Sequence, residues 1–341
     1  MTSKRRGILT AGTWCVDRNK LVTHWPYEDG LAEIVDEDSS GGGSACNLAI
    51  DIKKLDPAMS VATIGLIGDD ADGRLLLKQA DRHGIDRSQM VVSDSAPTHY
   101  TDAFASKATG RRTHITNIGV SVHLTPDHID ISNSAHRFLH LGIIGVHQLL
   151  DAPWHGEANG WVSVLKAARA AGLETNFELA GRAPEKLAVI TRPCLPYLDL
   201  LIVNDYEIGA ITGMATIRDD KTDPDACIEA ANAALSLGSQ QMVVVHFPAG
   251  AIVATREGDV VTRPSIQVPN DVIIGANGAG DAFAAGFLYG LHEGWPLDDV
   301  LSLAHAAAAA SLRGMSTTAA VEPWQTCLDL ARDWGWRSDL S

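Results

Sequence analysis

Residues 275–286 read Gly-Ala-Asn-Gly-Ala-Gly-Asp-Ala-Phe-Ala-Ala-Gly, and this stretch decides the fold class. A β-rich run, residues 268–274, precedes it and an apolar stretch follows it to Leu291, so we expect a strand, a glycine turn and a helix. The first amides of such a helix lack intrahelical partners, and the helix dipole adds partial positive charge there. Gly278 and Gly280 permit positive φ and a close approach to the backbone. The stretch therefore predicts an anion site, with phosphate as the expected ligand.

Asp281 lies in the first turn of this predicted helix, where a carboxylate would repel a phosphate unless it faced another group. One interpretation is a residue that caps the helix and complements its dipole. The other is a base beside the phosphate that faces an incoming hydroxyl group. The local sequence favours neither.

Composition narrows the class of protein. The 341 residues are 45% apolar, enough for a sizeable α/β core, and the net charge of −15 argues against a nucleic-acid partner. The five cysteines are scattered, with no C-x-x-C pair, so neither a disulfide framework nor a zinc ribbon is expected. No run of 18 apolar residues occurs, and no signal-peptide pattern follows the N-terminal charges. We expect a cytoplasmic protein without a membrane partner.

A second glycine turn, Ser39-Ser40-Gly41-Gly42-Gly43, opens another predicted helix with apolar residues at helical spacing. Three consecutive glycines can also form a flexible linker. A linker seldom runs straight into an amphipathic helix that has a polar residue such as Asn47 in its first turns. Further along the chain, Asn204-Asp205-Tyr206-Glu207 follows a predicted strand and fits a helix capping box.

Three of these motifs together resemble the ribokinase-like (PfkB) carbohydrate kinases. The segment Gly278-Ala279-Gly280-Asp281 resembles the family's C-terminal signature, and Gly42-Gly43-x-x-x-Asn47 resembles its N-terminal one. N-x-x-E at 204–207 lies between them, and the resemblance covers about residues 7–314. It implies an ATP-dependent kinase that phosphorylates a hydroxyl group of a sugar or sugar derivative.

The resemblance also implies roles for individual residues. The amides of Gly278, Ala279 and Gly280 would form an anion hole, and Asp281 would be the catalytic base. The acceptor would be held by four residues: Asp17, Gly42, Gly43 and Asn47. Glu207 would orient Mg²⁺ through water, and the nucleotide would lie near Asn204, Glu207, His246 and Asn277. The segment 176–182 would line the cleft.

The fold expected from the alternating strands and helices is one α/β domain over residues 1–341, with a doubly wound, mostly parallel sheet flanked by helices. We expect a first strand from Gly7 to Val16 that ends at Asp17. Residues 98–117 predict a hairpin that turns at Ala108-Thr109-Gly110-Arg111. By resemblance, a small β-sheet formed by about residues 18–38 and 97–118 would be a lid over the sugar and the contact of a homodimer.

Other phosphate motifs are excluded by inspection. The chain has no Gly-Lys dipeptide, and no glycines fit G-x-G-x-x-G, so neither a P-loop nor a dinucleotide fingerprint is present. The family usually has Asp and Thr where this chain has Gly275 and Ala276, which puts activation by a monovalent cation such as K⁺ in doubt. Two alternatives stay open. One is a nucleoside kinase, with Trp14, Trp25 and Tyr27 available to stack on a base. The other is a catalytically silent sugar- or nucleotide-binding regulator.

Overall fold

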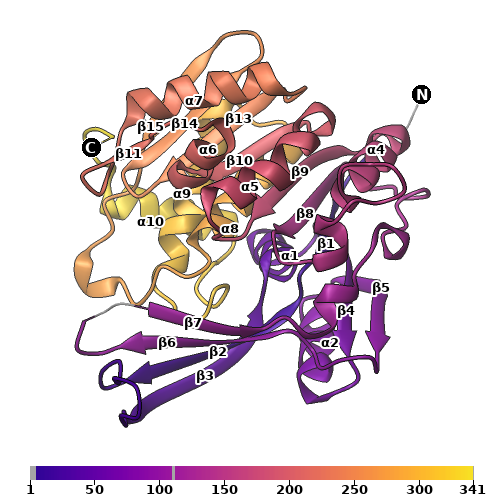
Figure 1. Cartoon of the computed structure of the whole chain (residues 1–341). Helices are drawn as coiled ribbons and strands as arrows, with labels where there is room; N and C mark the ends of the chain where they lie inside the picture. Colours follow the sequence, from indigo (N-terminus) through magenta and orange to yellow (C-terminus); the bar gives the residue numbers. More distant parts are fainter. Residues whose placement is uncertain (1–4, 110–111, 341) are drawn as a thin grey trace.

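The body of the protein is built on one layer of β-strands. The computed structural model describes residues 5–109 and 112–340. Five parallel strands form the first sheet, in the order β5 (Asp86–Ser93), β4 (Val61–Gly68), β1 (Ile8–Gly12), β8 (Phe138–Ile144) and β9 (Glu174–Leu179). The second sheet lies beside β9, in the order β10 (Leu200–Asn204), β13 (Met242–Phe247), β14 (Gly250–Thr255) and β15 (Val260–Pro264) (Figure 1). Its first pair is parallel and the other pairs are antiparallel.

Helices cover both faces of this layer and bury a separate apolar core against each. One core contains residues of α1 (Ser44–Leu55), α2 (Ala71–Arg82), α8 (Ala279–Glu293), α9 (Leu297–Ser311) and α10 (Trp324–Trp334). The other contains residues of α3 (Gln148–Asp151), α4 (Gly160–Ala171), α5 (Pro184–Thr191), α6 (Asp205–Thr212) and α7 (Pro224–Leu237). The prediction of a doubly wound, mostly parallel sheet is confirmed.

A small mixed sheet forms a layer separate from the body (Figure 1). Its strand order is β3 (Ile34–Gly42), β2 (Cys15–Val22), β6 (Tyr100–Ser106) and β7 (Arg112–Asn117). The pair β6–β7 is the hairpin expected over residues 98–117. Gly110 and Arg111 of its predicted turn lie outside the described residues. A two-stranded ribbon of β11 (Ile217–Arg218) and β12 (Lys221–Thr222) follows α6.

The predicted first strand, Gly7 to Val16, is wrong as a single element. Strand β1 ends at Gly12, and β2 begins at Cys15 in the small sheet. Gly12 has a φ of 133°, and a Cβ there would lie 1.7 Å from the carbonyl oxygen of Gly142, so the chain turns where only glycine fits. Asp17 is therefore the third residue of β2 and does not end a strand of the body.

The strand expected over residues 268–274 is also absent. This segment carries only a 3₁₀ turn, Asn270–Val272, and the last strand before α8 ends at Pro264. Pro269 has no N–H to donate to a ladder, and the following Asn and Asp favour turns. The glycine turn is therefore reached by an irregular segment and not by a strand. Within residues 5–109 and 112–340, no helix is long and apolar enough to cross a membrane.

Candidate active site

The N-terminus of α8 has the geometry of an anion site. Gly278 is its N-cap with a φ of 77°, and a Cβ there would lie 2.5 Å from the carbonyl oxygen of Thr317. The amide of Ala279 makes one long bond, 3.4 Å, to the Ala276 carbonyl oxygen. No hydrogen-bond partner for the amides of Gly280 and Asp281 is found in the described part of the chain. These unpaired donors and the helix dipole together favour a negatively charged ligand.

Asp281 is buried beside this turn, with 8% of its surface exposed. Its Oδ2 accepts a hydrogen bond of 3.0 Å from Asn47 Nδ2. Its Oδ1 is buried and receives no hydrogen bond from an N–H or hydroxyl group of the described residues, while the Glu178 carboxyl group lies next to the Asp281 carboxyl. Burial, and next the neighbouring carboxyl group of Glu178, raise the pKa of Asp281 well above its ordinary value. A buried carboxylate oxygen without a partner has the chemistry of a proton acceptor for an incoming group.

A chain of hydrogen bonds across three strands and α1 orients Glu178. The Ile202 amide donates to Asn176 Oδ1 (3.2 Å), and Asn176 Nδ2 donates to His140 Nδ1 (3.0 Å). His140 Nε2 then donates to Ser44 Oγ (2.7 Å), whose hydroxyl donates to Glu178 Oε2 (2.5 Å). Burial lowers the pKa of His140 to about 3, so the ring is the neutral tautomer that this order of donors requires. Burial also raises the pKa of Glu178.

The residues expected to hold the acceptor lie together where the small sheet meets α1. A Cβ at Gly42 would lie 2.1 Å from Asp17 Oδ2, so the Asp17 carboxyl packs directly on the glycine backbone. Gly43 has a φ of 87° and caps α1. Burial raises the pKa of Asp17 to about 6. Asn47 is used by the protein itself, because its Oδ1 accepts a hydrogen bond from Thr317 Oγ1 (2.9 Å) while its Nδ2 binds Asp281.

Glu207 and Asn204 form a capping box, in which each side chain binds the backbone N–H of the other residue. Burial raises the pKa of Glu207 to about 7. Both residues line a small cavity of about 70 Å³ together with Glu178, His246 and Gly280. Two carboxyl groups and an amide are suitable oxygen ligands for Mg²⁺, which keeps several waters and needs few direct protein ligands. In residues 5–109 and 112–340, no group of three side chains is arranged as a metal cage.

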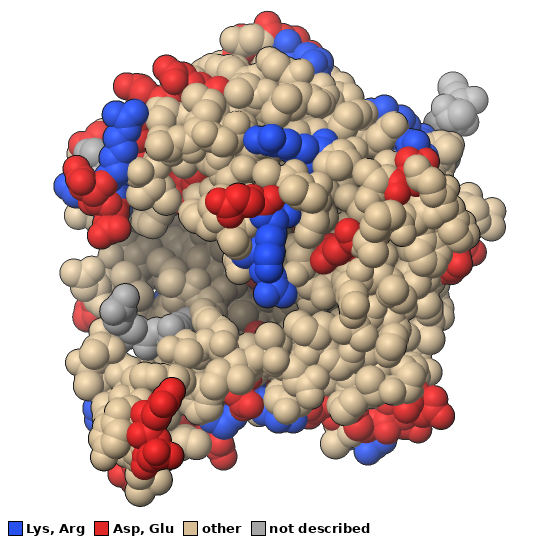
Figure 2. Space-filling model, in the orientation of Figure 1, with Lys and Arg blue, Asp and Glu red and all other residues tan. Residues whose placement is uncertain are grey.

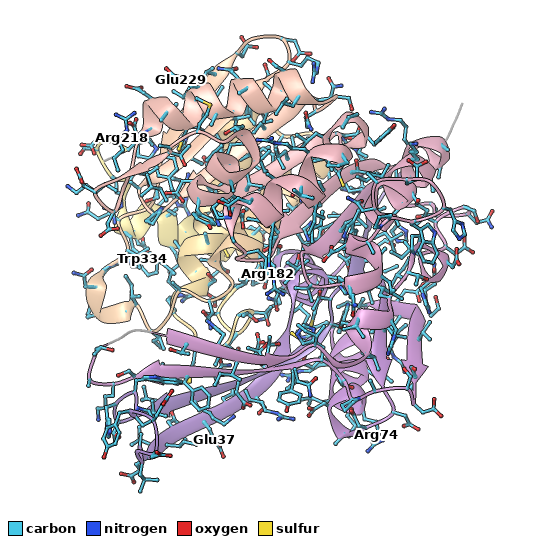
Figure 3. All side chains as sticks on the ribbon, in the orientation of Figure 1. Glu37, Arg74, Arg182, Arg218, Glu229 and Trp334 are labelled. Carbon is cyan, nitrogen blue, oxygen red and sulfur yellow. The ribbon has the colours of Figure 1, made fainter. Side chains whose placement is uncertain are left out.

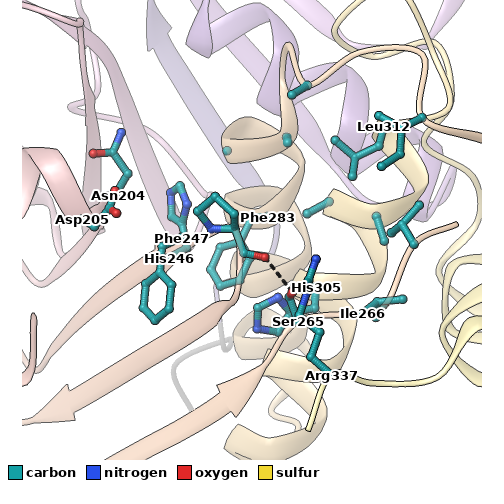
Figure 4. A pocket seen from close by; sticks show the side chains of 18 of the residues that line it. Asn204, Asp205, His246, Phe247, Ser265, Ile266, Phe283, His305, Leu312 and Arg337 are labelled. Carbon is teal, nitrogen blue, oxygen red and sulfur yellow. Dashed lines mark hydrogen bonds between the residues drawn. The ribbon is translucent and has the colours of Figure 1, made fainter. Parts of the chain in front are cut away.

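A larger cavity of about 540 Å³ adjoins the small one, and Asn204, His246 and Gly280 line both. Figure 4 shows its apolar side chains, which include Phe283, Ile266 and Leu312, from several elements. His246 packs on the Phe283 ring with centroids 5.0 Å apart, and burial lowers the His246 pKa to about 4. An apolar cavity that ends at unpaired helix amides fits a ligand with a flat ring at one end and phosphates at the other.

On its outside, the molecule is hollowed between the body and the small sheet (Figure 2). Arg182 lies where the body faces that sheet (Figure 3), and its Nε donates to the Gly145 carbonyl oxygen (2.9 Å). The carboxyl groups of Asp281 and Glu207 are thus buried, while the Arg182 guanidinium lies nearer the surface.

Two points of the sequence analysis concern the turn before α8: the expected nucleotide contact of Asn277 and the doubt about a monovalent cation. Asn277 lies in the turn but is not among the residues that line either cavity. Gly275 and Ala276 offer no side-chain oxygen, so these two positions cannot ligate a monovalent cation through their side chains.

Sequence reasoning missed several residues of the site. The series of hydrogen bonds through Asn176, His140 and Ser44 that orients Glu178 was not predicted. The hydrogen bond of Thr317 with Asn47 was not predicted either. The segment 176–182 was expected to line the cleft, but its glutamate was not singled out. Its position at the carboxyl end of a strand was the one available signal.

Comparison with known proteins extends the similarity over most of the chain. A sequence profile described as pfkB family carbohydrate kinase matches residues 8–324. The chain is 26% identical to a 5-dehydro-2-deoxygluconokinase of Geobacillus thermodenitrificans, over 89% of this chain and 86% of that one. It is 24% identical to an adenosine kinase of Schizosaccharomyces pombe, over 78% and 77% of the two chains.

Solved structures share the fold. An Arabidopsis thaliana ribokinase, complexed with ribose and ATP, has a TM-score of 0.78 at 20% identity, covering 96% of this chain and 99% of that one. A ribokinase of Giardia lamblia has a TM-score of 0.79 at 22% identity, with the same coverage of both chains. At these identities the likeness concerns the arrangement of helices and strands.

Proposed function

Because this chain belongs to the pfkB family of carbohydrate kinases, we propose that it transfers the γ-phosphoryl group of ATP to a hydroxyl group of a sugar or sugar derivative, with Asp281 as the base. One observation carries the proposal. The Asp281 Oδ1, which receives no hydrogen bond from an N–H or hydroxyl group of the described residues, lies beside the unpaired amides of Gly280 and Asp281, and the two cavities meet at this turn.

Catalysis of phosphoryl transfer depends mainly on positioning and on stabilising charge, because the transition state is loose. The amides of Gly278, Ala279, Gly280 and Asp281 are proposed to bind the γ-phosphate oxygens as negative charge develops. Gly280 suits this role because its missing side chain leaves the amide open to a ligand. The turn packs closely on Thr317 through Gly278, which favours a site formed before the ligand binds.

Asp281 is proposed to remove the proton of the acceptor hydroxyl. The hydroxyl oxygen attacks the γ-phosphorus, the bond to the β–γ bridging oxygen breaks, ADP leaves, and the proton passes to Oδ1. A carboxylate is a weak base for an alcohol, so the proton moves late, as the new P–O bond forms. Burial raises the pKa of Asp281 and so makes it a stronger base than an exposed carboxylate.

The nucleotide is proposed to occupy the larger cavity, with its rings near Phe283 and His246 and its phosphates toward Gly280. Glu207 and Glu178, which both line the small cavity, would hold Mg²⁺ through its waters. Bound Mg²⁺ would supply charge neutralisation on the phosphate oxygens. Asp17, Gly42 and Gly43 are proposed to orient the acceptor hydroxyl.

A sugar is favoured over a nucleoside as the acceptor. Trp14, which could have stacked on a base, is fully buried, and its indole nitrogen donates to Thr63 Oγ1 (2.8 Å). Trp25 packs edge-on against Phe104 in the small sheet, and Tyr27 is 81% exposed. The side chains of Asn47, Glu178 and Asp17 lie near Asp281 and are polar, which suits a substrate rich in hydroxyl groups.

The small sheet is proposed to act as a lid and as a dimer contact. It carries exposed apolar side chains at Ile34, Val35 and Ile115. Covering this apolar surface in a homodimer would remove it from water. Light scattering should give twice the chain mass, and Ile115→Lys should reduce it to the chain mass. A monomeric wild-type protein at micromolar concentration would refute this part.

The function is tested by ADP release over a panel of neutral sugars, sugar acids and nucleosides, with the phosphorylated product identified by mass spectrometry. A sugar or sugar acid that gains one phosphate, with turnover well above ATP hydrolysis, is the expected result. Turnover confined to nucleosides would show that the acceptor is a nucleoside and not a sugar. No turnover on any acceptor would reject the proposal.

A further inference from the structure

The loop of residues 312–322, here called the support loop, joins α9 to α10 and lies behind the N-terminus of α8. The Leu312 carbonyl oxygen accepts hydrogen bonds from the amides of Ile274 (2.8 Å) and Gly275 (3.2 Å), just before the glycine turn. Gly278 packs so closely on Thr317 that a Cβ would lie 2.5 Å from the Thr317 carbonyl oxygen. The position of the proposed phosphate amides therefore depends on where this loop is held.

The support loop is also linked to the proposed base. Thr317 Oγ1 donates to Asn47 Oδ1 (2.9 Å), and Asn47 Nδ2 donates to Asp281 Oδ2 (3.0 Å). All three residues are buried. A displacement of the loop would therefore move both the amides and the Asp281 carboxyl group.

Two cationic side chains bind carbonyl oxygens of this loop and of the end of α9. Lys54, in the last turn of α1, donates to the carbonyl oxygens of Thr318 (2.6 Å) and Ala319 (2.8 Å). Arg313 donates to the carbonyl oxygens of Ala310 (3.2 Å) and Ala320 (3.0 Å) and pairs with Glu322. Ligation of carbonyl oxygens by a charged group is the interaction that a bound monovalent cation would provide.

We propose that the Lys54 ammonium and the Arg313 guanidinium fix the support loop, and through it the phosphate amides and Asp281, so that catalysis needs no monovalent cation. The inference rests on the proposed function of residues 278–281. Lys54 and Arg313 are positioning residues, since they act through the loop and touch no substrate. Gly275 and Ala276 have no side-chain oxygens with which to ligate a cation. This agrees with a loop that is held by side chains of the protein and not by a bound ion.

Lys54→Met is the test variant, because it keeps the length of the side chain and removes the charge. Lys53→Met is the matched control. Lys53 is the preceding residue and also binds two carbonyl oxygens, those of Pro57 (2.5 Å) and Met59 (3.0 Å), but these belong to the turn that follows α1 and not to the support loop. Lys54→Arg restores the charge.

Steady-state rates on the sugar found in the panel are compared in tetramethylammonium chloride and in potassium chloride at equal ionic strength. We expect the same wild-type kcat in both salts. We expect Lys54→Met to lower kcat roughly tenfold, and at most about a hundredfold, as small misplacements of catalytic groups do, with an unchanged Kd for the sugar. Lys53→Met and Lys54→Arg should keep the wild-type kcat.

Two results would overturn the inference. One is a wild-type enzyme that is activated by potassium, and the other is equal kcat values for Lys54→Met and Lys53→Met. Stimulation of Lys54→Met alone by potassium would support it, because the vacated carbonyl oxygens could then bind the ion. Both overturning results leave the panel turnover intact, so they are distinguishable from a failure of the proposed function.

Discussion

Replacing Glu207 by glutamine should stabilise the unliganded protein above neutral pH and at the same time lower its turnover. Glutamine can keep the capping box, since its side-chain oxygen accepts the Asn204 amide as the carboxylate does. The substitution therefore removes the charge and little else. It therefore measures two effects of the Glu207 charge separately: the loss of folding stability without ligands, and the contribution to turnover through the proposed Mg²⁺ site.

The magnitude follows from the pKa of Glu207, which burial raises from 4.5 to about 7. This difference corresponds to about 3 kcal/mol, at 1.36 kcal/mol for each pH unit. Only 8% of the residue is exposed, so solvent screening takes little from this value. The folded state binds the proton more tightly than the unfolded state does. Wild-type stability is therefore lost as pH rises from 4.5 to about 7, and the cost is absent below 4.5.

Urea unfolding of both proteins, without nucleotide or Mg²⁺, measures this cost. We expect Glu207→Gln to be more stable by up to about 3 kcal/mol near pH 8, and by under about 1 kcal/mol near pH 5. Glu185→Gln is the matched control, because Glu185 lies exposed in the first turn of the neighbouring α5. An equal stability difference at both pH values, or a destabilised variant at the higher pH, would refute the reasoning.

Three further predictions concern the acceptor site and the base. Gly42→Ala should raise the KM for the sugar, because its Cβ would lie 2.1 Å from Asp17 Oδ2. The control Gly181→Ala has open space around its Cβ and should leave KM unchanged. Equal effects of the two substitutions on KM would contradict this prediction. Ser44→Ala should lower kcat about tenfold and move the acid limb of kcat/KM to higher pH, because Glu178 loses a donor to its charged form. An unmoved limb would count against the role given to this hydroxyl. The wild-type kcat/KM should fall as pH drops through about 7 and about 6, where Glu207 and Asp17 take up protons. The raised pKa of Asp281, the proposed base, adds to the same fall. A flat profile from about pH 8 to about pH 5 would contradict the assigned charges.

Much of the fold could be predicted because the relevant signals are local. The turn at Gly278 has positive φ and heads a helix, as its glycines and the following small apolar residues indicated. The capping box of Asn204 and Glu207 was visible in four residues of sequence. Strand ends were less predictable. The chain leaves the body at Gly12 because Gly142 lies against it, and that residue is 130 positions away.

The connections within the site could not be predicted, because they join residues far apart in the sequence. Asn47 and Asp281 were each identified from their own motif, but their hydrogen bond spans 234 positions. Glu178 acquires its orientation from α1 and from the neighbouring strands through Ser44 and His140. Such contacts depend on strand order and helix packing, which periodicity alone does not specify. Trp14, near the motifs in sequence, points into the core instead.

Whether Asp281 moves the proton can be measured in a single turnover. Asp281→Asn is mixed with ATP, Mg²⁺ and the sugar, and phosphorylated product is followed by quenched flow while calorimetry measures the binding of each substrate. The control is Asp51→Asn, which changes a second buried acid, in α1 and outside the glycine turn that begins α8. A transfer rate lowered by about 10³-fold or more in Asp281→Asn alone, with binding retained, is the predicted result. Transfer at the wild-type rate in Asp281→Asn would contradict the account.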